Sequence, residues 1–222
     1  MRANTIALLT AMALLAGCAS APRTEAQHYE VDRSRCVDSI TAVPALSIPH
    51  TEKRKDRFPK PRSFEQVATC MLAQDGNPVP VVLMTISRDL PLEVQIYLLT
   101  RGEIALAASI DLLDGERRLL RTVPFSDFVR RGGAYSGSIF LNRGDDEVRY
   151  LLMRPDPDAV GASDASVVGK TNSTPAVFAA GAAIYLVTIR TGSEQLSRTW
   201  LSEVGEFSVR SLPGNASTID SR

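Results

Sequence analysis

The chain has 222 residues, and its 25 lysines and arginines balance its 25 aspartates and glutamates, so the formal net charge at neutral pH is zero. A chain without excess positive charge has no overall field that attracts nucleic acid or anionic lipid, and we expect no nucleic-acid partner. The length is sufficient for one domain, or for two small ones, with a substantial hydrophobic core.

The N-terminus has the pattern of a secretion signal. A basic start at residues 1–2 precedes an uncharged, mostly apolar stretch over 6–16, which is too short to span a bilayer. The stretch ends in Leu-Ala-Gly-Cys at 15–18 and resembles the lipobox of bacterial lipoproteins. This resemblance implies that residues 1–17 are removed as a signal peptide and that lipid is attached to the thiol of Cys18. The alternative is an ordinary signal peptide with a chance cysteine.

The residues after Cys18 indicate which membrane is involved. Two or three acyl chains hold a protein on a bilayer far more firmly than one. Ala19 follows the cysteine, whereas bacterial lipoproteins retained on the inner membrane typically carry Asp there. We therefore expect a protein anchored to the outer membrane by its lipid and facing the periplasm. No second long apolar run predicts a transmembrane helix.

Residues 18–34 are rich in Ala, Pro, Arg, Thr, Glu and Gln, a composition that predicts a flexible lipidated tether. Beyond Cys18 the chain has two cysteines, Cys36 and Cys70. An even pair in an oxidising compartment predicts a disulfide, and two buried free thiols are the alternative. The basic, proline-broken stretch 51–62 predicts a solvated loop, with a patch for phosphate head groups or acidic glycans as the alternative.

From Phe64 onward the pattern has a period of two, which is typical of strands. Over 92–98, apolar residues alternate with Glu93, Gln95 and Tyr97, which predicts one buried face and one wet face. Asp114-Gly115 predicts a tight hairpin turn, since glycine accepts the positive φ that such turns need. Further strands are expected at Val81–Ile86, Ala105–Leu113, Leu119–Val123, Tyr135–Leu141, Val148–Met153, Ile184–Ile189 and around 207–209.

These elements predict an all-β fold, an antiparallel β-sandwich or jelly-roll-like body. The main sandwich is expected over 35–155. Small and polar residues over 156–180 predict a long loop or linker. C-terminal strands over 181–213 are expected to complete the sandwich, and 214–222 to form a disordered tail.

Residues that carry chemistry are few. Both histidines, His28 and His50, precede the strands, so no base accompanies a nucleophile there, and neither has a metal-ligand partner at the required spacing. We therefore expect no catalytic residue, no metal and no cofactor. Tyr97, Tyr135 and Trp200 are candidates for a carbohydrate-binding surface, with ordinary packing as the alternative.

The run from Val79 to Pro155 resembles the maltose operon periplasmic protein family. The resemblance is carried by the strand Pro-Leu-Glu-Val-Gln-Ile at 91–96, the turn Ile-Asp-Leu-Leu-Asp-Gly at 110–115, the aromatic segment at 123–128 and the strand at 149–154. It is a likeness of strands and turns over about half of the mature chain. It implies an accessory role in carbohydrate uptake and supplies no catalytic residues.

Two hypotheses follow. The first is a non-catalytic outer-membrane lipoprotein that assists envelope transport, with maltose or maltodextrin as the carbohydrate. The second is a structural or assembly subunit of an envelope machine for secretion or pili, whose strand edges bind partner proteins. The expected partners are the membrane, through the lipid on Cys18, and envelope proteins or glycans.

Overall fold

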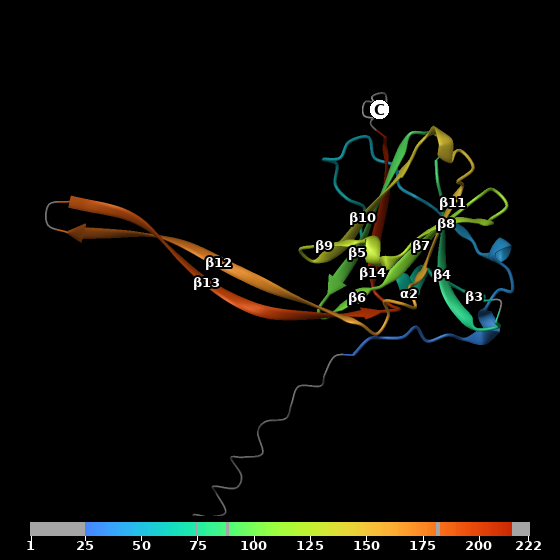
Figure 1. The fold of residues 1–222 in the computed structure, drawn as a ribbon, viewed down its shortest axis with the longest axis horizontal. Helices are drawn as coiled ribbons and strands as arrows, with labels where there is room; N and C mark the ends of the chain where they lie inside the picture. Colours follow the sequence, from blue (N-terminus) through green and yellow to red (C-terminus); the bar gives the residue numbers. More distant parts are fainter. Residues whose placement is uncertain (1–24, 74, 88, 181–182, 215–222) are drawn as a thin grey trace, which may run out of the picture.

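The protein is all-β, as the sequence predicts. A computed structural model describes residues 25–214 apart from 74, 88, 181 and 182, and within 166–196 it describes the backbone. Two β-sheets pack against each other to form a body, and one long hairpin projects from that body (Figure 1). No helix among the residues described is long and apolar enough to cross a membrane.

The first sheet has the strand order β1-β4-β11-β7-β8, and β3 also pairs with β4. Its strands are β1 (Ala45–Ser47), β3 (Thr69–Leu72), β4 (Pro78–Thr85), β7 (Ala108–Leu113), β8 (Leu119–Val123) and β11 (Tyr150–Pro155). Most of its pairs are antiparallel, but β1 pairs with β4 in parallel. The expected purely antiparallel sandwich is therefore corrected to a mixed one.

The second sheet has the order β12-β13-β6-β5-β10-β9, and β14 joins β5 to the short strand β2. Its strands are β2 (Arg62–Ser63), β5 (Leu92–Arg101), β6 (Ile104–Leu106), β9 (Val129–Arg131), β10 (Ala134–Leu141), β12 (Ser163–Ala180), β13 (Ala183–Ser202) and β14 (Glu206–Pro213). The parallel pair in this sheet joins β13 to β6. The jelly-roll-like arrangement stays a prediction.

Short helices punctuate the strands. They are η1 (Arg33–Arg35), η2 (Ile40–Ala42), α2 (Phe64–Val67), η3 (Phe125–Asp127) and η4 (Arg143–Asp145). The segment 63–72 contains the short helix α2 followed by β3, which carries Cys70.

Apolar side chains from both sheets form one core. The inward residues of β5, Val94, Ile96 and Leu98, are 0% exposed, and Leu151 and Met153 of β11 in the other sheet are equally buried. The alternation over 92–98 places every second side chain on this face, as predicted. Burial of apolar area between the sheets is therefore the main source of stability of the body.

The N-terminal part of the chain wraps around the outer faces of both sheets. Val43, which is 1% exposed, packs with Leu83 and Leu152 on the outer face of the first sheet. On the second sheet, the backbone N–H of Thr51 donates to the carbonyl of Ser211 at the edge of β14, and the following residues cross the outer face, where Arg210 donates to the carbonyls of Arg54 and Asp56. Both sheets therefore have buried residues on their outer faces as well.

Three local predictions are corrected. Of the flexible tether expected over 18–34, the described part, 25–34, is attached to the body, because the N–H of Gln27 donates to Ser202 Oγ. In the turn between β7 and β8 the positive φ falls at Arg117 rather than at Gly115, because Asp114 Oδ1 accepts the N–H groups of residues 116 and 118. The loop expected over 156–180 is strand β12 from Ser163 onward.

Candidate functional site

The long hairpin formed by β12 and β13, called the arm here, is the most prominent surface feature. Its two strands are 18 and 20 residues long and pair without a register shift from Ser163↔Trp200 to Ala180↔Ala183. At about 3.3 Å per residue the paired part extends about 55 Å. Figure 1 shows that most of this length lies clear of the body.

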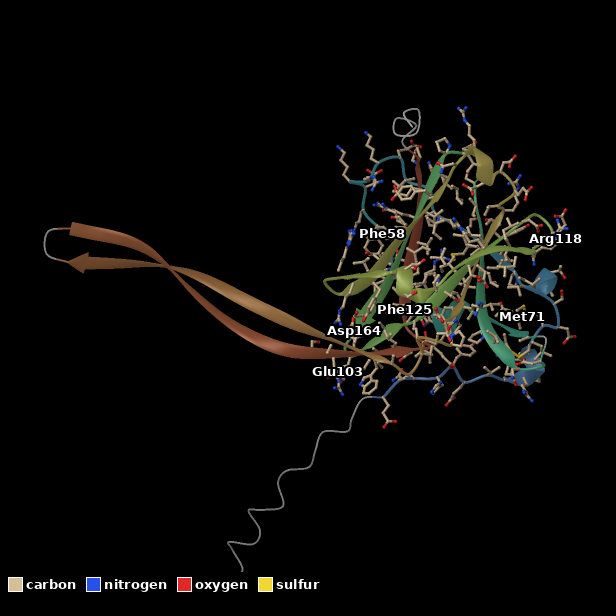
Figure 2. The ribbon with its side chains drawn as sticks, viewed as in Figure 1. Phe58, Met71, Glu103, Arg118, Phe125 and Asp164 are labelled. Atoms are coloured by element: carbon tan, nitrogen blue, oxygen red, sulfur yellow. A yellow bond between two sulfur atoms is a disulfide. The ribbon has the colours of Figure 1, made fainter. Side chains whose placement is uncertain are left out.

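The arm is fixed to the body at its root. Trp200–Ser202 of β13 pair with Ile104–Leu106 of β6, and Thr199 is fully buried. Arg130 of β9 donates to Asp164 Oδ2 at 3.1 Å and to Thr199 Oγ1 at 2.9 Å, so it bridges the two strands of the arm. These contacts hold the direction in which the arm leaves the body (Asp164 is labelled in Figure 2).

Tyr135 completes the root. Its hydroxyl donates to Asp164 Oδ2 at 2.8 Å, and the guanidinium of Arg130 lies 5.7 Å from the centre of its ring. Burial, and then the hydrogen bond to Asp164, raise the pKa of Tyr135 well above its ordinary value. The tyrosine is therefore a neutral donor at the root throughout the physiological pH range.

The sequence of the arm changes along its length. Charged residues occur near the root and up to Lys170 on β12 and Arg190 on β13, but 171–189 contains none. The register pairs 176–180 with 183–187, so two apolar stretches lie side by side at the far end. The arm thus has a polar shaft and an uncharged, apolar end.

A second unusual surface lies where both sheets end in open edges. β8 pairs only with β7, and β9 covers β10 only at Ala134–Ser136, so within the described part of the chain Gly137–Leu141 has a strand partner on one side only. A groove of about 360 Å³ lies between Arg121–Val123 of β8 and Gly137–Phe140 of β10. We call this groove, together with the open edges of β8 and of Gly137–Leu141 beside it, the open seam.

The open seam has exposed apolar side chains around it. Among the residues whose side chains are described, the exposed large hydrophobics are Leu119, Leu120, Val129 and Phe140, which belong to β8, β9 and β10. Phe128 lines the groove and lies against Gly137, where a Cβ atom would come within 3.0 Å of the ring. An exposed edge strand with apolar side chains is a template for the addition of another strand.

The outer face of β5 carries a buried polar network instead of the expected wet face. Glu93 and Gln95 are 2% and 7% exposed, because the 51–62 loop covers them. Arg210 Nε donates to Gln95 Oε1 at 2.9 Å, and the two terminal nitrogens of Arg210 donate to carbonyls of the loop at Asp56 and Arg54. The prediction that this face meets water was wrong.

The 51–62 loop is held against the sheet by more than hydrogen bonds. The side chain of Arg54 pairs with the buried carboxylate of Glu93. Phe58, labelled in Figure 2, stacks under Arg210 with 4.4 Å between the guanidinium carbon and the ring centre. The loop is therefore part of the folded body, although Lys53, Lys55 and Arg57 are exposed and keep its surface basic.

The three aromatic candidates do not form one surface. Tyr97 packs on Phe58 with ring centres 4.5 Å apart on the outer face of the second sheet. Tyr135 is 4% exposed and pairs with Leu98, so it faces the core on the opposite side. Trp200 is half-buried in the root of the arm, beneath Arg198. All three aromatic side chains therefore take part in packing, and they do not lie together on one surface.

The cysteine pair is joined as predicted. Cys36 and Cys70 form a disulfide with their Cα atoms 4.4 Å apart, and it ties the N-terminal segment to β3. Cys18 lies outside the described residues. His28 lies 3.4 Å from Glu203 on the surface, and no group of three or more His, Cys, Asp or Glu side chains within the described ranges is placed to hold a metal ion.

Sequence reasoning missed both the arm and the open seam. The arm could not be predicted because the pairing of β12 with β13 depends on their register over many residues. The open seam could not be predicted because the exposure of β8 depends on which strands lack a neighbour in the folded sheets. Comparison with known proteins gives no family: no protein-family model, curated protein or solved structure matches the chain. The lipobox and the likeness to the maltose operon periplasmic protein family therefore stay predictions.

Proposed function

We propose that the chain is a non-catalytic, lipid-anchored subunit of an envelope assembly, which binds a partner protein with its arm. The observation that carries the proposal is the arm itself, with its uncharged end about 55 Å from its root. Of the two hypotheses from the sequence, this favours the assembly subunit over the transport accessory.

The physics of a free hairpin supports a binding role. A lone two-stranded hairpin is at best marginally stable in water, because it has no second layer to bury its side chains. Beyond the root, both outer strand edges of the arm also present N–H and C=O groups that have no strand partner in the described part of the chain. The apolar end of such a hairpin adds little to the stability of the body, so we expect its role to be contact with another molecule.

The expected anchor is compatible with this role. Gln27 is hydrogen-bonded to Ser202 and Glu203 at the root of the arm. Cys18 stands nine positions earlier, so an extended tether reaches at most about 30 Å. A lipid on Cys18 would then keep the root of the arm within that distance of the membrane and leave the far end free to reach a partner.

An accessory role in carbohydrate uptake rests on the family resemblance alone. Tyr97, Tyr135 and Trp200 are separated and packed, so the geometry adds no aromatic platform in its support. We therefore rank it second.

Replacement of the arm tests the proposal. In the variant, residues 167–196 are replaced by Asn-Gly, which forms a two-residue turn between the paired residues Ser166 and Ser197 and leaves Asp164 and Thr199 in place. We expect the chain with an intact arm, extracted from the envelope of its host in mild detergent, to migrate in an assembly larger than a single chain. The variant should migrate as a single chain with an unchanged melting temperature.

The control for this experiment is Lys170→Gln, which removes a charge from the polar part of the arm and leaves the apolar stretches 176–180 and 183–187 intact. It should retain the large assembly. If the variant without the arm migrates with the same mass as the unaltered chain, the arm is not the binding element and the proposal is wrong.

The anchor is tested separately. Cys18→Ser removes the thiol that would carry lipid, so a metabolically incorporated fatty-acid analogue should label the unaltered chain and not the variant. Equal labelling of both chains would contradict the anchor and leave the role of the arm untouched.

A further inference from the structure

We infer that the uncharged end of the arm binds the open seam of a second copy of this chain, by adding one of its strands to the open edge of β8 or of β10. This inference rests on the proposed function and names the partner of the arm. It connects the two surfaces of the molecule that its own fold leaves unpartnered.

The open seam has the features of a strand acceptor. β8 and the Gly137–Leu141 part of β10 each carry backbone groups on the side without a neighbouring strand in the described part of the chain. Every residue of β8 from Leu119 to Thr122 is exposed. Phe140 is 57% exposed beside it, so an added strand would cover apolar side chains as well as backbone.

The arm has the features of the matching donor. β8 has 5 residues, and the apolar stretches 176–180 and 183–187 of the arm have the same length. Neither stretch contains a charge that would have to be buried without a partner. Among the residues that the structure describes, each strand of the arm pairs at these positions with the other strand alone, so its outer edge is available for pairing.

A protein edge suits the arm better than a lipid bilayer does. In hydrocarbon, the unpaired N–H and C=O groups along both edges of a single hairpin would each cost several kcal/mol. Addition to the open seam instead supplies backbone partners for one of these edges. The same step removes the exposed edge of β8 or β10, which would otherwise invite uncontrolled pairing.

The acceptor must belong to another copy. The arm leaves the body in a direction fixed by Arg130, Asp164 and Thr199, and Figure 1 shows its far end distant from β8 and β10 of the same chain. Two different surfaces then meet, the arm of one copy and the seam of the next. Such a head-to-tail contact forms a ring if the rotation closes and a filament if it does not.

Cysteine cross-linking tests this contact. Two differently tagged, full-length chains are produced together: one carries Phe140→Cys in the open seam, and the other carries a single cysteine at one position of 176–180 or 183–187. We expect a disulfide-linked pair of the two tags that is strong at every second position, because neighbouring residues of a strand face opposite sides. Cysteine in place of Ala45, which is exposed on β1 at the opposite edge of the sheet that contains β8, should give no such pair.

A charge substitution gives a second test that does not depend on cysteine. Phe140→Asp places a carboxylate where the arm would pack, and its exposure in the free chain means that the body should still fold. We expect self-association, measured by light scattering, to weaken at least about tenfold. The matched control is Ala45→Asp, which should associate like the unaltered chain and share its melting temperature.

The outcomes separate this inference from the proposed function. Absence of the 140–arm cross-link, or equal cross-linking from position 45, overturns the inference. If the large assembly is nevertheless lost when the arm is replaced, the arm binds a different protein and the proposed function stands. If the assembly survives loss of the arm, the proposed function fails as well.

Discussion

The body and the arm are built from the same kind of strand but are stabilised in different ways. In the body, Val94, Ile96 and Leu98 are completely buried between two sheets, and outer faces are covered by the N-terminal segment. Beyond its root, the arm has backbone pairing between β12 and β13. The free energy of unfolding therefore comes mainly from the body, and we expect substitutions in the arm beyond its root to leave the fold of the body intact.

The largest effect should come from a charge in the core of the body. Val94→Asp places a carboxylate without a partner at a site that is 0% exposed, which should cost about 4 kcal/mol or more and unfold the chain. Urea denaturation followed by circular dichroism measures the change. Val129→Asp, the same substitution at a site that is 54% exposed, should alter the free energy of unfolding by less than about 0.5 kcal/mol. Similar losses in both variants would refute the packing described.

The next effect concerns the disulfide that holds the wrapping segment. Replacement of both Cys36 and Cys70 by Ala opens a loop with a sequence separation of 34 and should lower the free energy of unfolding by about 3 kcal/mol. Non-reducing peptide mapping should find the cross-linked pair in the unaltered protein. Two thiols that react with alkylating reagent in the native state would contradict the bond.

A smaller effect is expected on the outer face of β5. Arg210→Met keeps much of the side-chain volume but removes the donor to Gln95 and to two loop carbonyls, at a cost of about 2 kcal/mol. Hydrogen exchange of amides over 51–62 should become faster. Arg57→Met, an exposed change in the same loop, should leave both measurements unaltered.

The smallest effect should fall on the root of the arm. Asp164→Asn weakens the contacts to Arg130 and Tyr135, but Asp164 is partly exposed, so the loss for the body should stay below about 1 kcal/mol. Amides of the arm next to residues 164 and 199 should exchange faster, while those of β5 do not change. A global loss of protection would show that arm and body unfold as one unit.

The contrast also explains which elements the sequence could predict. β5, β8 and β10 lie close to their expected bounds because alternation marks β5 and short apolar or aromatic stretches bounded by turn residues mark β8 and β10. β12 was missed because Ser, Asp, Lys, Asn and a proline at Pro175 give it little strand propensity. Its strand structure comes from the register with β13, which no local pattern reveals.

The second face of β5 was misjudged for a related reason. Glu93 and Gln95 have the polarity of a wet face, and alternation alone cannot show that Arg210 and the 51–62 loop supply partners for them. Phe58, which stands among basic residues in the 51–62 loop, indicates that the loop packs against the body, since burial of an aromatic ring is favourable. Pairing of Cys36 with Cys70 was predictable because an even pair of cysteines behind an expected export signal favours a disulfide.

The wrapping of the N-terminal segment has a consequence for the order of folding. Gln27 binds Ser202, which is 175 positions later, and Thr51 pairs with Ser211 of the last strand. If the chain emerges N-terminus first, its earliest residues must wait for the latest ones before the body can close, and such distant contacts slow folding. Gln27 and Thr51 would therefore remain accessible until Ser202 and Ser211 have been synthesised.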